Sequence, residues 1–278
     1  MNTSISSFSI AAAGSRVVWR MVLLLIGGLL LLPILAVLFA STQVNPESTD
    51  TLWQMAMTVL PEYARTSLLL CAVVAVGVLV VGLGVATLVT VVNFKGRGFW
   101  EWALLLPLAM PAYVSAYAYT DFLQFSGPLQ TWLRESRGLE GPLLPDVRTV
   151  WGAAFLFVFT MYPYVYLLAR TALLERATHL LEAAGMLGAG TWSRIWRVAL
   201  PLVRPAVAAG VALALMETLA DFGVSSYFGI QTFTAGIIKA WVVMEDTVAA
   251  TQLSVASLVA VMTLALVERF ARHRQRYA

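Results

Sequence analysis

The sequence predicts an all-α membrane protein, a bundle of six transmembrane helices. Of its 278 residues, 60% are hydrophobic and only 12% are charged, whereas soluble domains are about 45–50% apolar and about 25% charged. Five long uncharged apolar stretches, and a sixth that contains two carboxylates, supply the spans. A disordered chain is excluded because disorder requires few apolar residues. A disulfide-rich fold is excluded because Cys71 is the only cysteine.

Each predicted span has about 20 mostly apolar residues, the length that crosses the hydrocarbon core of a bilayer. Pro107 and Pro111 are expected to kink the third span, and Glu217 and Asp221 interrupt the fifth. The first stretch is too long for the apolar core of a signal peptide and no clean cleavage site follows it, so we expect an uncleaved helix. The spans are expected, in order, at residues 21–40, 66–94, 102–120, 149–169, 201–222 and 247–267.

The basic residues predict the orientation of the bundle. With six spans, both termini share one side with 13 of the 18 Lys and Arg residues. Positive charge marks the cytoplasmic side, so both termini are predicted to be cytoplasmic. Without the interrupted fifth span, Arg269 to Arg276 would move outside and spoil this asymmetry. We therefore divide the chain into a cytoplasmic tail at 1–20 with a Ser-rich start that shows no sign of fold, a transmembrane domain at 21–268, and a basic cytoplasmic tail at 269–278.

The inward loop at about 171–204 is neither disordered nor polar, and we expect it to form two short helices separated by a break. Residues 180–184 favour a helix, and Gly185, Gly188 and Gly190 then interrupt it. Thr191 is expected to cap the second helix, and Pro201 to end the loop and open the next span. A structured, partly apolar loop on this side predicts a docking surface for another protein.

This loop resembles the EAA loop of binding-protein-dependent ABC importer permeases. The matching positions are Glu182, Ala183, Ala184, Gly188, Val198, Leu200 and Pro201. The family pattern has Ile where this chain has Val198. The resemblance implies a bundle of the type I ABC importer permease kind, whose loop is a coupling helix seated in a groove of a separate ATPase subunit. It also implies that Glu182 faces that subunit and that Gly188 permits the tight turn. The alternative is an ordinary helical hairpin between two spans.

Two more segments are similar to ferric-iron permeases. Residues 107–121 with Gly127 and Pro128 resemble the third span of those proteins, and residues 216–223 with 227–229 resemble the end of their fifth span. The resemblance implies ferric iron as cargo, a periplasmic substrate-binding protein as partner and a location in the bacterial inner membrane. It also implies a second permease half that is identical, homologous or fused, because iron permeases commonly carry two EAA loops and this chain has one. Thiamine permeases are close relatives and supply an alternative cargo.

Four side chains are candidates for the translocation path: Glu217, Asp221, Tyr113 and Tyr117. A carboxylate inside a span costs roughly 2.5–3.5 kcal/mol, so Glu217 should face a partner or a wet cavity. Asp221 lies four residues further along the same helical face, and two carboxylates at an outer mouth would favour a hard trivalent ion. Tyr113 and Tyr117 share a face, although such tyrosines more often anchor the membrane interface. Glu217 has an equally weighted structural interpretation, as a hydrogen-bond acceptor or a helix cap.

No catalytic chemistry is predicted. The sequence contains no P-loop pattern and no metalloprotease or hydrolase motif, so we expect ATP hydrolysis on a separate subunit. Two distant histidines and one cysteine predict no metal site and no cofactor. The basic residues do not form a patch with interleaved aromatic residues, so the expected partner is the lipid bilayer and not nucleic acid. Two other classes stay open: a proton-coupled secondary transporter that uses Glu217, and a membrane scaffold whose inward loop docks an assembly factor.

Overall fold

The computed structural model describes residues 4–274, without the side chains of residues 4–17, 176–179, 264 and 267–274. Every element assigned within this range is helical, as predicted. The elements are α1 (Ser4–Ser41), α2 (Pro46–Thr58), α3 (Leu60–Val91), α4 (Arg97–Ala103), η1 (Leu106–Ala109), α5 (Ala112–Leu123), α6 (Pro128–Arg137), α7 (Val150–Ala172), η2 (Leu173–Ala177), α8 (Thr178–Met186), α9 (Thr191–Arg194), η3 (Ile195–Ala199), α10 (Leu200–Ala220), α11 (Gly223–Phe228), α12 (Phe233–Ile238), η4 (Lys239–Val243) and α13 (Thr247–Arg274).

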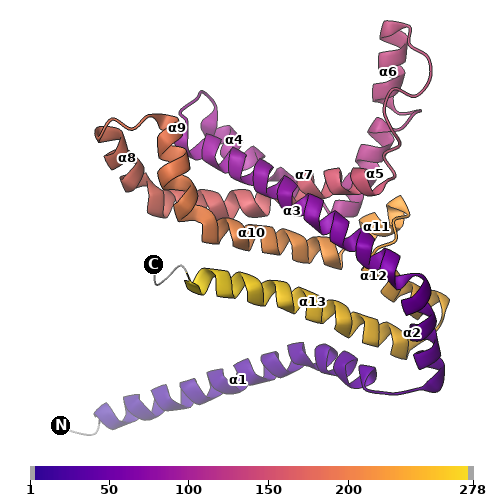
Figure 1. Cartoon of the computed structure of the whole chain (residues 1–278). Helices are drawn as coiled ribbons and strands as arrows, with labels where there is room; N and C mark the ends of the chain where they lie inside the picture. Colours follow the sequence, from indigo (N-terminus) through magenta and orange to yellow (C-terminus); the bar gives the residue numbers. More distant parts are fainter. Residues whose placement is uncertain (1–3, 275–278) are drawn as a thin grey trace.

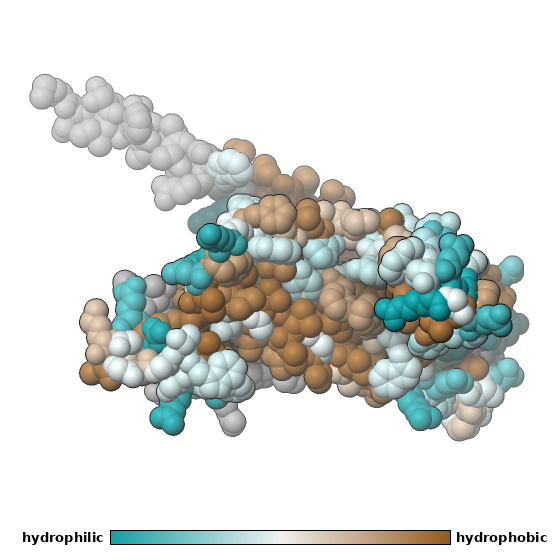
Figure 2. Space-filling model, turned by 90° about the horizontal axis from the view of Figure 1, so that it is seen from above, coloured by the Kyte–Doolittle hydropathy of each residue, from teal (hydrophilic) through white to brown (hydrophobic). Residues whose placement is uncertain are grey.

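Several of these helices are long and apolar enough to cross a membrane. Within the described residues, four such spans cover Val18–Ser41, Leu60–Val91, Val150–Glu175 and Thr191–Ala220. They correspond to the predicted first, second, fourth and fifth spans. The predicted sixth span falls in α13, whose side chains are described only in part. On the face seen in Figure 2, hydrophobic residues cover the middle and hydrophilic residues gather toward the two ends, which is the distribution that a bilayer-spanning bundle requires.

Helices α3, α7 and α10 pack against one another and form the core of the bundle. In the most apolar stretch of the α7 span, two thirds of the residues are buried inside the fold. In the corresponding stretch of α1, none is buried. Large side chains of α7, Phe157 and Tyr166 among them, are fully buried together with Leu70 and Val74 of α3. The centre of the fold is therefore a helix trio around α7, and α1 packs at the edge of the fold against α13 (Figure 1).

Three glycines permit the close approach of these core helices. A Cβ on Gly82 of α3 would lie 2.8 Å from the carbonyl oxygen of Tyr162, and a Cβ on Gly210 of α10 would lie 2.6 Å from the Cα of Val165. Gly77 likewise leaves no room for a Cβ against Val158. Small residues at helix contacts are the usual means of bringing membrane helices together. Gly84, in the same helix, makes no such close approach, because a Cβ added there would meet no atom within 4 Å.

The third span is broken, and the expectation of one kinked helix over residues 102–120 is therefore wrong. Residues Arg97–Ala109 and Ala112–Arg137 meet at an angle of 99°. Met110 between them is extended, and Pro111 is the N-cap of α5. Two prolines four residues apart each remove a backbone donor and obstruct the preceding turn. Their combined effect ends one helix and starts another.

The connections at the end of the bundle opposite α8 and α9 contain several short helices. Helix α6 projects from this end (Figure 1). Helices α2, α11, α12 and η4 were not predicted from the sequence. Met55 of α2, Ala240 of η4 and Leu253 of α13 form a second, smaller apolar cluster. Ser48 also donates a hydrogen bond of 2.8 Å to Oδ1 of Asp246, just before α13.

The two ends of the chain lie on one side of the bundle. The start of α1 and the end of α13 lie at the same end of the molecule as α8 and α9 (Figure 1). The backbone of α1 is helical from Ser4, so the expectation that the Ser-rich start of the chain shows no fold is wrong; Ala11, Ala12 and Ala13 are strong helix formers that continue the span. The predicted basic tail at 269–278 lies outside the residues whose side chains are described.

Candidate functional site

The predicted inward loop is a helical hairpin formed by α8 and α9 at one end of the bundle (Figure 1). We call residues 178–194 the α8–α9 hairpin. Helix α8 ends at Met186 and α9 begins at Thr191, so the prediction of two short helices with a break between them is confirmed. The hairpin leaves α7 through η2 and returns to α10 through η3. It is thus connected at both ends to the core trio of helices.

The turn between α8 and α9 depends on the backbone conformation of Gly188. It has φ of +82°, a left-handed conformation that glycine adopts without the steric penalty of a Cβ. Its N–H donates to the carbonyl of Gly185, and the N–H of Ala189 donates to the carbonyl of Ala184, both at 3.0 Å. This pair of hydrogen bonds is the Schellman arrangement that ends many helices. The glycine of the EAA pattern therefore has a specific backbone role, which the resemblance alone had only implied.

Arg194 holds the two arms of the hairpin together. Its Nη1 lies 3.4 Å from the carbonyl oxygen of Leu181 in α8, and its Nη2 lies 3.2 Å from Oγ1 of Thr191. The guanidinium passes over Gly185, where a Cβ would lie 3.0 Å from Nη1. Leu181 packs against the core cluster of the bundle, and Ile195 is buried. The hairpin is therefore a packed unit attached to the bundle, as a docking element must be.

The outer surface of the hairpin is apolar and exposed. Met186 and Leu187 at its tip are each 88% exposed. Trp192 and Trp196 are also exposed, and their rings meet edge to face at 5.8 Å between centroids. In the EAA pattern, Glu182, Ala183, Gly188 and Pro201 are exposed, whereas Ala184, Val198 and Leu200 are partly buried. An exposed apolar cluster on a rigid hairpin marks a protein interaction surface.

One local prediction about this segment is wrong. Thr191 is not the N-cap of α9, because that position is taken by Gly190 and the hydroxyl of Thr191 accepts from Arg194 instead. Pro201 lies in the first turn of α10, as expected, but the helical backbone is continuous from Thr191 to Ala220. A π-helical turn, η3, precedes Pro201, and the N–H of Leu200 bonds to the carbonyl of Ile195. The wider turn accommodates the missing N–H and the bulky ring of proline without ending the helix.

The two candidate carboxylates lie in different environments. Glu217 is exposed on α10 and makes no hydrogen bond or ion pair among the described residues. Asp221, directly after α10, is partly buried, and its Oδ1 accepts a hydrogen bond of 2.7 Å from the N–H of Val224. Asp221 thus caps the first turn of α11 from the residue before its N-cap position, Phe222. Glu217, which was considered as a cap for the end of its own span, has no hydrogen-bond partner for its carboxylate among the described residues.

The two candidate tyrosines face α11. The Cβ of Tyr113 lies 3.0 Å from the position that a Cβ on Gly223 would take. The ring of Tyr117 lies 6.0 Å from that of Tyr227, which also carries the guanidinium of Arg148 over its face at 5.0 Å. The structure therefore brings α5 next to the segment that Asp221 caps, which sequence separation alone could not establish.

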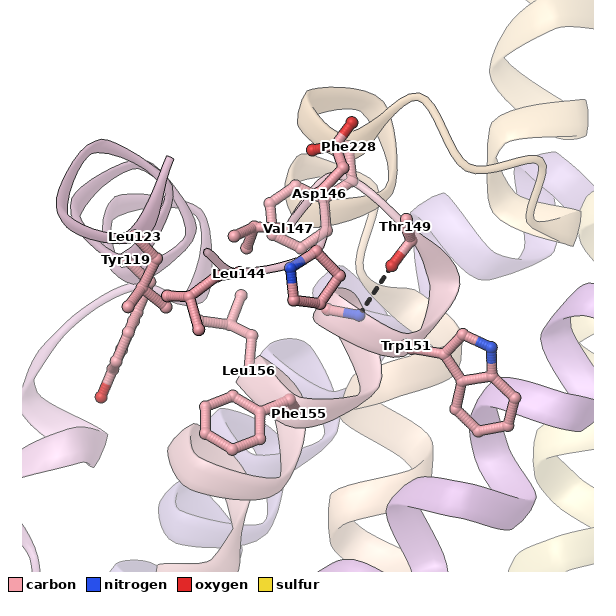
Figure 3. Close-up of a pocket in the computed structure, with 12 residues that line it drawn as sticks. Tyr119, Leu123, Leu144, Asp146, Val147, Thr149, Trp151, Phe155, Leu156 and Phe228 are labelled. Atoms are coloured by element: carbon pink, nitrogen blue, oxygen red, sulfur yellow. Dashed lines mark hydrogen bonds between the residues drawn. The ribbon is translucent and has the colours of Figure 1, made fainter. Parts of the chain in front are cut away.

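A cavity of about 630 Å³ lies close to this region, at the other end of the bundle from the hairpin. Figure 3 shows the side chains around it: Tyr119 of α5, Leu144 of the loop between α6 and α7, Phe155 of α7 and Phe228 of α11. Apolar side chains predominate in the lining, and the hydroxyl of Thr149 already accepts from the N–H of Gly152. Asp146 supplies the charged group of the lining, and its Oδ1 accepts from the N–H of Arg148, so the cavity offers few ligands that could replace the hydration shell of an ion. Within the described residues, no group of three or more His, Cys, Asp or Glu side chains is placed to hold a metal.

Sequence reasoning missed a polar cluster at the end of the core from which the α8–α9 hairpin extends. Glu101 of α4 forms ion pairs with Arg97 and with Arg170 near the end of α7. The i, i+4 spacing of Arg97 and Glu101 was a visible signal. The third member lies 69 positions further along the chain, and only the fold places it there.

Comparison with known proteins is consistent with these features. The family model for the binding-protein-dependent transport system inner membrane component matches residues 79–276. The chain is 27% identical over 260 residues to an Fe(3+)-transport system permease protein of Haemophilus influenzae, covering 92% of this chain and 46% of that one. It is 29% identical over 232 residues to a probable sulfate transport system permease protein of Chlorokybus atmophyticus, covering 79% and 76%.

The fold also resembles that of solved transporters. A crystal structure of a bacterial ABC transporter involved in the import of the acidic polysaccharide alginate contains a chain that superposes with a TM-score of 0.76. The sequences are 17% identical, and the match covers 96% of this chain and 99% of that one. The likeness concerns the fold alone. The present chain spans about half the length of the iron-transport relative.

Proposed function

Because the chain belongs to the family of binding-protein-dependent transport system inner membrane components, we propose that it is the permease half of an ATP-driven importer whose cargo is ferric iron. The observation that carries this proposal is the α8–α9 hairpin. Its EAA pattern positions Gly188 at the left-handed turn, and its exposed apolar tip provides a surface for an ATPase subunit. The chain itself is a permease and not an enzyme; ATP hydrolysis occurs on that separate subunit.

The proposed mechanism follows from how the hairpin is attached. An ATPase that closes on ATP displaces the hairpin, and η2 and η3 pass this displacement to α7 and α10 of the core trio. Close packing at Gly82 and Gly210 makes the three helices move as a unit. The bundle then alternates between states open to either side. A periplasmic binding protein delivers the cargo, and the path runs between this half and a second half that is identical, homologous or fused.

The proposed path surface is formed by α5 and α10. Glu217 has an unpartnered, exposed carboxylate on α10 among the residues described, and Tyr113 and Tyr117 are exposed on α5. Asp221 contributes negative charge while its Oδ1 caps α11. Carboxylate and phenolic oxygens suit a hard trivalent cation. These weak, scattered ligands would pass an ion without trapping it, as transport requires.

Sulfate is the second candidate cargo. The observation in its favour is the length of the match, because the chain covers 76% of the sulfate permease relative but only 46% of the iron one. The two cargoes have opposite charge, so one experiment separates them. Proteoliposomes that contain this chain, its ATPase and its binding protein should take up radiolabelled Fe³⁺ in an ATP-dependent manner and leave sulfate outside. Sulfate uptake would replace the iron assignment, and uptake of either ion without an ATPase would overturn the importer proposal.

The proposed orientation places the hairpin in the cytoplasm and α6 in the periplasm. Cys71 is the only cysteine, so a Cys71→Ser background allows single-cysteine labelling in cells. Glu135→Cys on the exposed surface of α6 should react with a membrane-impermeant maleimide from outside. Met186→Cys at the hairpin tip should react only after permeabilisation. The reverse pattern would invert the topology and remove the hairpin from reach of any cytoplasmic ATPase.

A further inference from the structure

Three polar contacts connect the first part of the broken third span to one stripe of α7. The hydroxyl of Tyr162 donates to the carbonyl of Leu104 at 2.9 Å, and that of Tyr166 donates to the carbonyl of Glu101 at 3.1 Å. Nη2 of Arg170 lies 2.8 Å from Oε2 of Glu101. Positions 162, 166 and 170 are spaced by four residues, so they lie on one face of the helix. This stripe holds α4 and the following turn along the inner half of α7.

The Glu101 side chain is the point where two parts of the chain converge. Its Oε1 lies 3.1 Å from Nε of Arg97, and Nη1 of Arg97 in turn donates to Oδ1 of Asn93, between α3 and α4. Its Oε2 binds Arg170, three residues before η2 begins at Leu173. The single carboxylate therefore connects the α3–α4 corner, the broken span and the base of the α8–α9 hairpin.

Charge balance makes this carboxylate difficult to replace. The side chains of Arg97, Glu101 and Arg170 are only 29%, 23% and 25% exposed. Two guanidinium groups share one acid, and Nε of Arg170 is buried without a hydrogen-bond partner among the described atoms. Removal of the carboxylate would leave two half-buried cations facing each other. Charge-assisted pairs of this kind are stronger and more directional than neutral hydrogen bonds.

We propose that Glu101 is a positioning residue for transport, which connects movement of the α8–α9 hairpin to the broken third span. This inference rests on the proposed importer function. A displacement applied at the hairpin reaches Arg170 through η2, and the pair with Glu101 carries α4 and η1 along with α7. Because α5 follows the break at Met110, movement of α4 and η1 changes the position of Tyr113 and Tyr117. Without the Glu101–Arg170 pair, the hairpin still moves and ATP is still hydrolysed, but α4 and η1 no longer move together with α7.

The test is the ratio of cargo transported to ATP hydrolysed, measured on the complete complex in proteoliposomes. Glu101→Gln should lower this ratio by roughly tenfold, the effect expected from loss of one charge-assisted interaction. The ATPase rate should stay within about twofold of the wild-type rate. A merely structural role would reduce both rates together and leave the ratio unchanged. Glu62→Gln, at an exposed acid at the other end of α3, is the matched control and should leave both rates unchanged.

Exchange of the charges at positions 101 and 170 tests whether a reversed ion pair restores transport. Arg170→Glu alone should uncouple the complex, whereas Glu101→Arg combined with Arg170→Glu should recover part of the ratio, because the 101–170 pair is restored in reverse. Hydrogen exchange supplies a readout that needs no transport. Amides of residues 97–110 should exchange faster in Glu101→Gln than in the wild type, with residues 200–220 unaffected.

The outcomes separate this inference from the proposed function. A wild-type complex without ATP-dependent uptake would contradict the importer proposal, and the exchange experiment would still report on the connection between α4 and α7. An active wild type with an unchanged transport ratio in Glu101→Gln, or with unchanged exchange at 97–110, would overturn the role of Glu101 alone. Failure of the exchanged pair to recover any coupling would overturn it as well.

Discussion

The backbone N–H of Ala189 donates a hydrogen bond to the carbonyl of Ala184, five residues earlier, and encloses Gly188 in the left-handed turn of the α8–α9 hairpin. This relationship explains why the EAA pattern needs a glycine at that position. It also makes the tip of the hairpin a rigid corner on which Met186 and Leu187 stand exposed.

Replacement of Gly188 by Ala should weaken the hairpin. A Cβ in the left-handed region costs about 1–2 kcal/mol, even though open space surrounds the position. We expect lower co-purification of the ATPase and lower uptake. Gly190→Ala is the control, because its φ is −64° and no atom lies within 4 Å of the added Cβ. Equal behaviour of the two variants would show that the turn conformation does not matter for docking.

Leu187→Asp should reduce the affinity for the ATPase without unfolding the bundle, because the side chain is 88% exposed. Burial of a leucine at an interface contributes about 1.5–3 kcal/mol, which corresponds to a roughly tenfold to hundredfold loss of affinity. The measurement is a binding titration of the purified ATPase against the permease. Leu139→Asp, at an exposed leucine of the outer loop, should bind like the wild type. Unimpaired binding by Leu187→Asp would place the docking surface elsewhere.

Gly82→Ala and Gly210→Ala should each destabilise the core trio of helices. Each added methyl group meets backbone atoms of α7 that cannot move aside, the carbonyl oxygen of Tyr162 in one case and the Cα of Val165 in the other. Overpacking of this kind costs about 1–3 kcal/mol, and thermal unfolding in detergent would measure it. Gly84→Ala in the same helix as Gly82 should unfold at or slightly above the wild-type temperature, since alanine favours a helix more than glycine does. A wild-type melting temperature for Gly82→Ala would contradict the packing.

The Ser48–Asp246 contact predicts a pH dependence at the end of the bundle opposite the α8–α9 hairpin. Burial disfavours the charged form of Asp246, but hydrogen bonds from the Ala249 N–H and the Ser48 hydroxyl outweigh it and hold the pKa of this carboxyl below its ordinary value. Because the folded pKa is depressed, the stabilisation is present above about pH 4, the usual pKa of an unfolded Asp. It is lost as the pH falls through the folded pKa.

Asp246→Asn tests this dependence directly. The variant should melt below the wild type at neutral pH, and the two melting temperatures should converge below about pH 4. Ser48→Ala should show part of the same loss, because it removes one of the donors. A constant difference between wild type and Asp246→Asn across this range would mean that the carboxylate charge contributes nothing to stability.

Glu217→Gln should lower Fe³⁺ uptake while leaving the fold intact, because the carboxylate is exposed and has no hydrogen-bond partner among the described residues. Loss of a unit charge from a partly dry path should lower the transport rate roughly tenfold.

For Asp221, the Asn variant keeps an acceptor for the N–H of Val224, whereas the Ala variant removes it. Reduced uptake by Asp221→Asn would support a role in the path. Normal uptake by Asp221→Asn with a defect only in Asp221→Ala would leave this residue as a helix cap.

The helical membrane class, four of the spans and the helical-hairpin form of the predicted inward loop could all be predicted from the amino-acid pattern. These properties depend on hydrophobic length and on glycine at a single turn, which are local and can be read along the chain. It did not predict the 99° break at Met110, since prolines alone do not distinguish a kinked helix from an ended one.

Contacts between groups far apart in the sequence depend on the assembled bundle. The ion pair of Glu101 with Arg170, the cap from Asp221 to α11 and the approach of Tyr113 to Gly223 depend on how α4, α5 and α11 pack around α7. Helix packing depends on side-chain shapes from segments far apart in sequence, and no periodicity within one segment encodes it. The partners of each polar side chain therefore become visible only when the bundle is assembled.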